Sequence, residues 1–187
     1  MMMTAVMSFA PINVFAIPYA RSLGIDMDTY GKYLALTFGI SLGLTYFIGW
    51  LVDVLHPLRM AVIALLAYVA VTLWARFAAT TPSTFLVAWV AHGVISGVYF
   101  TSSASLGQRL YPREKFAQFA SAASMVASPA SMALAPVVGL VLDHTGKDYH
   151  ITFSIGCGLA LTALVLAFFV HRQFMRLGGP KGYVAPV

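Results

Sequence analysis

Charged residues are scarce in this sequence, and that scarcity excludes most kinds of protein. Asp, Glu, Lys and Arg make up 9% of the 187 residues, whereas hydrophobic residues make up 60%. A water-soluble domain carries about 25% charged residues. The apolar residues form six runs, each long enough to cross the ~30 Å hydrocarbon core of a bilayer as a helix. These runs cover about residues 4–20, 31–52, 59–79, 84–106, 117–142 and 150–171.

The runs predict an all-α membrane protein, with a six-helix transmembrane bundle over residues 1–172. Residues 173–187 are basic and then contain Gly and Pro, so we expect a disordered cytoplasmic tail there. Glycines at near-helical spacing in the second run predict the close approach of a neighbouring helix. They are Gly31, Gly39, Gly43 and Gly49.

Cysteine is also nearly absent, and the residues that could bind a metal are scattered. The single Cys157 excludes an internal disulfide, and no metal-ligand spacing surrounds it. His144 and His150 flank the last loop with two aspartates, which we interpret as helix-end residues rather than a zinc site. Ser96 follows His92 on the same helix and lacks the Gly-x-Ser-Gly context of an intramembrane protease. We therefore expect no metal, no cofactor and no enzymatic activity.

The few charges are divided unevenly between the two sides of the bundle. Seven of the 11 basic residues lie near the termini or in the connections after the second and fourth runs. The positive-inside rule places that side, and both termini, in the cytoplasm. The N-terminus lacks the charged segment and cleavage site of a signal peptide. We expect a multi-pass protein of the cell (inner) membrane, whose basic surplus needs no nucleic acid to explain it.

Two runs carry polar or small side chains at helical spacing. Trp89, His92, Ser96 and Tyr99 follow one another at steps of three and four, which puts them on one helix face. This face is a candidate solute-lining surface, because polar residues in membranes face a bundle interior or a water-filled cavity. The alternative is interhelical hydrogen bonding, which we favour for Ser96. His92 lies roughly 12 Å into the span, and a structural role and a functional role are equally consistent with it. The fifth run has a predicted close-packing stripe of Ser121, Ser124, Ser128 and Ser131.

The strongest local pattern closes the second run. Gly49 precedes Asp53 by four residues, and Arg59 follows after a short turn. The aspartate can pair with an arginine and hold one conformation of a moving bundle, or it can simply end the helix in water. The stretch resembles the cytoplasmic loop of the major facilitator superfamily, which reads glycine, three residues, aspartate, basic residues and a glycine. Val54 and His56 depart from that pattern, as is typical of the C-terminal half in this family.

The resemblance implies one six-helix half of a twelve-helix transporter that works by alternating access. Because the chain begins inside its first helix, we expect a fragment or a misplaced start, with the bundle completed by an N-terminal six-helix half or by a second copy. In this family the first and fourth helices of each half line the central cavity. That adds two residues to the predicted lining set, which becomes Asn13, Tyr19, Trp89, His92, Ser96 and Tyr99.

Aromatic and hydroxyl groups suit a neutral polyhydroxyl solute, and the chain looks most like cation-coupled sugar carriers. We therefore expect a sugar, moved together with H+ or Na+. No Asp or Glu occurs in the middle of any run. The cation site then lies in the other half or at His92, or transport is uncoupled. An organic-anion carrier of the same superfamily and a non-transporting six-helix subunit are the alternatives.

Overall fold

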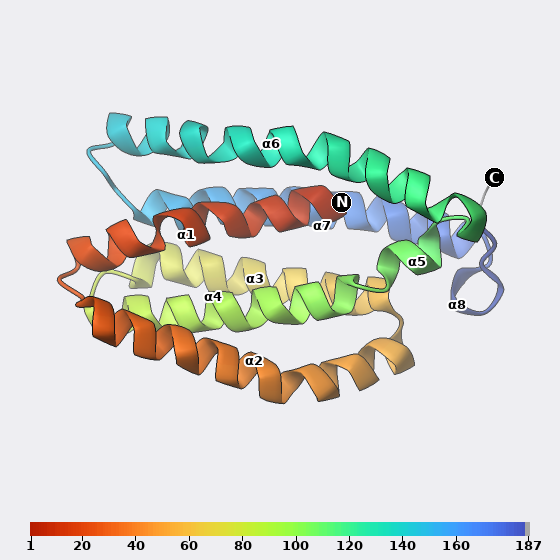
Figure 1. Ribbon diagram of the computed structural model, residues 1–187, viewed down its shortest axis with the longest axis horizontal. Helices are drawn as coiled ribbons and strands as arrows, with labels where there is room; N and C mark the ends of the chain where they lie inside the picture. The colour runs from red at the N-terminus through yellow and green to blue at the C-terminus, as the bar shows by residue number, and fades with distance from the viewer. Residues whose placement is uncertain (186–187) are drawn as a thin grey trace.

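The computed structural model describes residues 1–185, and every regular element in that range is a helix (Figure 1). Six of the helices in this described range are long and apolar enough to cross a membrane, which confirms the predicted fold class. The elements are α1 (Met2–Ser22), α2 (Met27–Leu55), α3 (Pro57–Ala78), α4 (Pro82–Ser103), α5 (Leu106–Leu110), the 3-10 helix η1 (Arg113–Lys115), α6 (Phe116–His144), α7 (His150–Arg176) and α8 (Gly179–Gly182).

Four helices form the centre of the bundle and two flank it. In Figure 1, α1 and α4 lie in front of α7 and α3, with α6 along the top and α2 along the bottom. The packed pairs are α3 with α4 and α7, α1 with α7, and α2 with α4, while α6 contacts mainly α1. Only 11% of the most apolar window of α2 and of α6 is buried, against 33% to 44% in the other four long helices. We call α1, α3, α4 and α7 the inner helices, and α2 and α6 the flanking helices.

Glycines of α7 and α4 permit the close approach of neighbouring helices. A Cβ added to Gly156 of α7 would lie 2.9 Å from the Ser8 carbonyl oxygen of α1, and one added to Gly93 of α4 would collide with Thr37 Cγ2 of α2. A Cβ would meet nothing within 4 Å at any of the α2 glycines Gly31, Gly39, Gly43 and Gly49. The prediction that these α2 glycines receive a neighbouring helix is therefore wrong within this bundle. Gly31, Gly39 and Gly43 lie on its uncovered surface, and Gly49 is half-buried.

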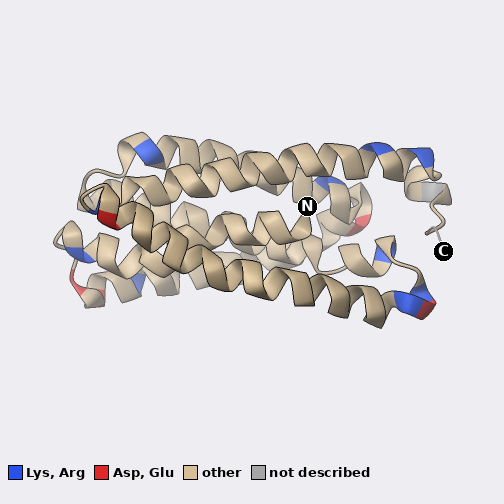
Figure 2. Ribbon diagram, turned by 90° about the horizontal axis from the view of Figure 1, so that it is seen from above, with Lys and Arg blue, Asp and Glu red and all other residues tan. Residues whose placement is uncertain are grey.

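Charged side chains gather at the two ends of the bundle and leave its middle apolar (Figure 2). One end contains the α2–α3 turn, α5, η1 and the end of α7, and we call it the basic end. The opposite end contains the other three long-helix connections. There the Asp26 carboxylate caps α2 by accepting the Thr29 N–H at 2.8 Å, which lowers the pKa of Asp26. Among the described side chains, six basic residues lie at the basic end: Arg59, Arg109, Arg113, Lys115, Arg172 and Arg176.

The segment after α7 folds back on the basic end. α7 runs to Arg176, past the predicted end of the last run at 171. The Tyr183 ring lies 5.0 Å from the Phe174 ring, and its hydroxyl donates to the Leu110 carbonyl oxygen at 2.9 Å. Much of the segment in which the sequence predicts a disordered tail therefore has defined contacts, while residues 186–187 lie outside the described part of the chain.

Candidate functional site

A chain of polar groups crosses the centre of the bundle and joins three inner helices. The Tyr68 hydroxyl of α3 donates to the Ser8 carbonyl oxygen of α1 at 3.1 Å and lies 3.0 Å from His92 Nδ1 of α4. The other ring nitrogen, His92 Nε2, lies 3.0 Å from the Asn13 Oδ1 of α1. An amide offers both a donor and an acceptor, so Asn13 matches either tautomer of the neutral ring. We call Ser8, Tyr68, His92 and Asn13 the central polar chain.

Asn13 is the exposed end of this chain, and the other side chains are buried. His92 and Tyr68 are each 0% exposed, whereas Asn13 is exposed. Asn13 reaches His92 of α4 from α1, so the α1–α4 contact is open to the surface at this point. A solute at that surface can touch the Asn13 amide, while His92 can act only through Asn13.

The other residues of the predicted lining face are packed inside the bundle. Trp89 stacks on Tyr30 of α2 and on His92, with ring centroids 5.5 Å apart in both pairs. Ser96 donates to the Gly93 carbonyl oxygen of its own helix at 2.9 Å, so its bond is intrahelical and not the interhelical one that we favoured from the sequence. Tyr99 lies 5.5 Å from the Phe9 ring. Within the described residues, the buried Trp89 Nε1 and Tyr99 hydroxyl have no hydrogen-bond partner.

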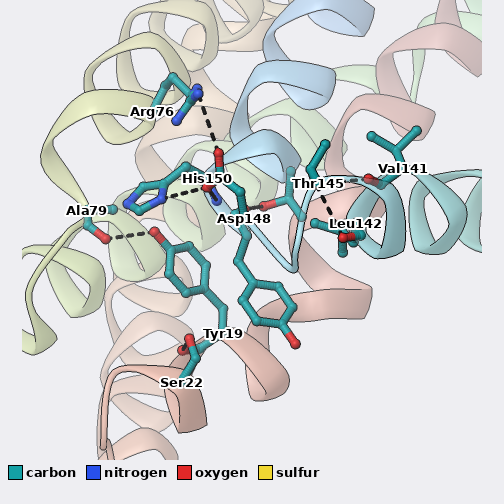
Figure 3. A network of polar contacts seen from close by, with 11 residues as sticks. Tyr19, Ser22, Arg76, Ala79, Val141, Leu142, Thr145, Asp148 and His150 are labelled. Carbon is teal, nitrogen blue, oxygen red and sulfur yellow. Dashed lines mark hydrogen bonds and ion pairs between the residues drawn. The ribbon is translucent and has the colours of Figure 1, made fainter.

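Tyr19, the remaining predicted lining residue, lies in a different cluster at the opposite end (Figure 3). Its hydroxyl donates to the Ala79 carbonyl oxygen at 2.7 Å, and its ring stacks on Tyr149. Beside it, Asp148 pairs with Arg76 at 3.6 Å and with His150 Nδ1 at 2.9 Å. Contacts from α1, α3 and the start of α7 meet here, so the cluster ties the ends of three inner helices together.

The structure also adds a residue that the sequence offered no reason to select. Tyr68 lies in the bland third run, and its partners His92 and Ser8 are 24 and 60 residues away in the chain. A tyrosine in the middle of an apolar run could have predicted a buried hydrogen bond, because a buried hydroxyl needs a partner. Its partner could not be read from spacing along one helix.

At the basic end, Asp53 pairs with Arg109 rather than with Arg59. Arg109 Nη2 donates to Asp53 Oδ1 at 3.2 Å, which joins the end of α2 to α5. Both side chains are well exposed, at 76% for Asp53 and 41% for Arg109. Gly49 faces open space and Arg59 is exposed. The pair is a contact between separate elements that a conformational change can break.

His56 holds the turn between α2 and α3 in a strained conformation. Its φ is 79°, in the left-handed region that glycine adopts freely and other residues avoid. His56 Nδ1 accepts the Leu58 N–H at 3.2 Å, and its ring packs 4.7 Å from Phe174. The resembling family motif has a glycine in this part of the loop, and the backbone here adopts the conformation for which glycine is suited.

The serine stripe of α6 lies on an uncovered face. Ser124 and Ser128 donate to carbonyl oxygens of α6 itself, at 3.0 Å and 2.9 Å. Its four members are all exposed: Ser121, Ser124, Ser128 and Ser131. The close packing predicted for the stripe is therefore not seen within the described residues, although Ser124 and Ser131 line a cavity of about 360 Å³ together with Val6 of α1 and Ser103 of α4.

Comparison with protein-family models adds the deciding observation. The model of the Major Facilitator Superfamily matches residues 1–181. The chain belongs to the Major Facilitator Superfamily. It is accordingly an integral, multi-pass membrane protein of a transporter family. Comparisons with curated proteins and with solved structures find no match. Membership of this family does not identify the solute, which has to be inferred from the residues of this chain.

Proposed function

We propose that this protein transports a neutral, hydroxyl-rich small molecule such as a sugar, by alternating access, with Asn13 as the first contact for the solute. The observation that carries the proposal is the central polar chain, whose buried members end in one exposed amide. An amide donates and accepts hydrogen bonds without carrying charge, which suits hydroxyl groups. The central polar chain itself contains no Lys or Arg that would favour an anionic solute.

The uncovered flanking helices support a second six-helix bundle as the partner. α2 exposes large apolar side chains along its length, and α6 exposes both its serine stripe and Met125 and Met132. Lipid would accept the apolar side chains, but small residues and hydroxyls are typical of helix–helix contacts in membranes. We propose that an N-terminal six-helix half or a second copy packs there and that the bundles rock about the solute. A coupled H+ or Na+ would bind in that bundle or at His92.

Uptake of radiolabelled glucose, maltose and succinate into vesicles from cells that produce the protein tests the proposal. We expect saturable uptake of a sugar and an increase in KM of up to about tenfold for Asn13→Ala, the loss of one hydrogen bond to a neutral ligand. Thr162→Ala is the matched control, since Thr162 is an exposed α7 residue that bonds only to Gly158 of its own helix. Saturable uptake of succinate alone would support the organic-anion carrier, and no uptake would support the non-transporting subunit.

The role of His92 is tested in the same assay. His92→Ala removes the support behind Asn13, so we expect a higher KM. Tyr68→Phe keeps the ring packing and removes only the hydroxyl at Nδ1, so it should give part of the same change. Wild-type kinetics for both variants would mean that the central polar chain only holds the helices together.

A further inference from the structure

A groove lies on the outer surface of the bundle, between the two inner helices α3 and α7. It has a volume of about 320 Å³, and the residues that line it all belong to these two helices. Ala167 of α7 is 1% exposed, whereas Ile63 of α3 and Phe168 of α7 are 50% and 63% exposed. The small alanine therefore forms the floor of the groove, and two large apolar side chains stand at its sides.

The groove faces away from the proposed solute contact and from the proposed partner surface. The α1–α4 contact that includes Asn13 lies in front of α3 and α7 in Figure 1. The uncovered faces proposed for a second bundle belong to α2 and α6. The groove residues fall within 59–63 and 164–171, so neither the solute nor a second bundle on α2 and α6 would occupy the groove.

Positive charge marks one end of the groove. Arg59 and His171 line it at the basic end, and among residues 1–185 no acidic side chain lies within ion-pair distance of Arg59. The pKa of His56, in the adjoining turn, is lowered first by partial burial and then by the positive charges of Arg109, Arg59 and His171. The field of the groove residues therefore extends to their neighbours, and this end of the groove is suited to an anion.

The position of Arg59 within α3 also favours an anion. Arg59 is the third residue of α3, whose first turn contains no acidic side chain. The positive end of the helix dipole lies there, so it attracts an anion and disfavours an arginine. The stability of α3 alone therefore does not explain Arg59. A phosphate next to it would be attracted by the guanidinium and by the helix end together.

The rest of the groove is apolar. Leu164 lies seven residues before His171 in α7, which corresponds to about 10 Å along the helix axis. The side chains over this length include Ile63 and Phe168. An acyl chain lying there would run parallel to α3 and α7, as chains do in a bilayer, and its remaining carbons would continue among the surrounding lipids. A charged end and an apolar length match a phospholipid with one chain in the groove.

We propose that this groove binds an anionic phospholipid of the cytoplasmic leaflet, with its phosphate at Arg59 and one acyl chain between Ile63 and Phe168. Basic side chains at the cytoplasmic ends of transmembrane helices attract anionic headgroups, and the guanidinium fork suits phosphate oxygens. A lipid held there would join α3 to α7 on the face that the solute and the second bundle leave free.

Native mass spectrometry of the purified protein in detergent, titrated with phosphatidylglycerol or phosphatidylcholine, tests the headgroup contact. We expect preferential retention of phosphatidylglycerol and about tenfold weaker binding in Arg59→Gln, the loss of one hydrogen-bonded charge. Arg172→Gln is the matched control, because it removes the same charge beside His171 from a residue that does not line the groove. It should weaken binding less than about threefold. Equal weakening in both variants, or equal binding of the two lipids, would overturn the proposal.

The acyl-chain contact is tested by filling the groove from its side. Ile63→Trp places a large ring over Ala167 and leaves Arg59 in place, so we expect about tenfold weaker binding of phosphatidylglycerol, because buried methylene groups hold the chain. Leu73→Trp is the matched control, since Leu73 is an α3 residue of similar exposure, 53%, that does not line the groove. It should bind as the wild type does. Unchanged binding in Ile63→Trp would contradict the proposed site.

Two further outcomes would assign the groove to a different occupant. Glycerol phosphate carries the headgroup charge without acyl chains, and we expect it not to displace the lipid at equal concentration. Displacement by glycerol phosphate would assign Arg59 to a soluble anion. A dimer that persists in lipid-free detergent and dissociates in Ile63→Trp would assign the groove to a second copy of the chain. Either result would overturn the lipid site.

Discussion

Gly156 of α7 and Gly43 of α2 are both glycines within long membrane-spanning helices, yet their surroundings are opposite. A Cβ on Gly156 would press on the Ser8 backbone of α1, whereas a Cβ on Gly43 would meet nothing. Serines show the same contrast, since Ser8 is buried among the inner helices and Ser128 is exposed on α6. Small residues of the inner helices bring this bundle together. Those of the flanking helices remain free, which is what a bundle that slides against a second one needs.

The largest expected effect comes from adding one methyl group inside the inner helices. In Gly156→Ala the new Cβ meets a backbone oxygen at 2.9 Å, Ile12 Cδ1 at 3.4 Å and the Tyr68 hydroxyl at 3.5 Å. Since a backbone atom cannot move aside by rotation, we expect destabilisation of about 1–3 kcal/mol, measured by thermal unfolding in detergent. The same change at Gly158, on the same helix but facing open space, should instead stabilise by up to about 1 kcal/mol. Equal effects at both sites would contradict the packing of α7 on α1.

A smaller effect is expected where a flanking helix meets an inner one. Gly93→Ala places its methyl group against Thr37 Cγ2, so α2 must shift away from α4 at a cost of about 1–2 kcal/mol. Thr37→Ser removes that methyl group and keeps the hydroxyl that donates to the Tyr33 carbonyl oxygen. The double variant should therefore recover most of the lost stability in a double-mutant cycle. Additive losses would show that Gly93 does not set the distance between α2 and α4.

The fold could be predicted from the sequence because long apolar runs have few alternatives in a bilayer. Which face of each run packs could not, because lipid-facing and helix-facing side chains are both apolar, and so the predicted close approach of a helix to the α2 glycines is not found within this bundle. The spacing of Trp89, His92, Ser96 and Tyr99 identified side chains that share one environment. It could not show that this environment is the bundle interior, nor that Tyr68 completes it, because that partner comes from a different helix.

The same limit applies to Asp53, whose partner is Arg109 of α5 and not the nearby Arg59. The pair joins the end of the flanking helix α2 to α5, which follows the inner helix α4. A change to this pair should therefore alter transport while leaving the stability of the bundle nearly unchanged. We expect Asp53→Asn to change the unfolding free energy by less than about 1 kcal/mol, because exposed ion pairs contribute little. Turnover in the vesicle assay should nevertheless slow, if the pair holds one of the two conformations of the transporter.

Exchanging the charges in Asp53→Arg/Arg109→Asp should restore part of that turnover. Arg113→Gln is the control, because no acidic side chain in the described chain pairs with it, and a loss equal to that of Asp53→Asn would mean that net charge at the basic end, rather than this contact, sets the rate.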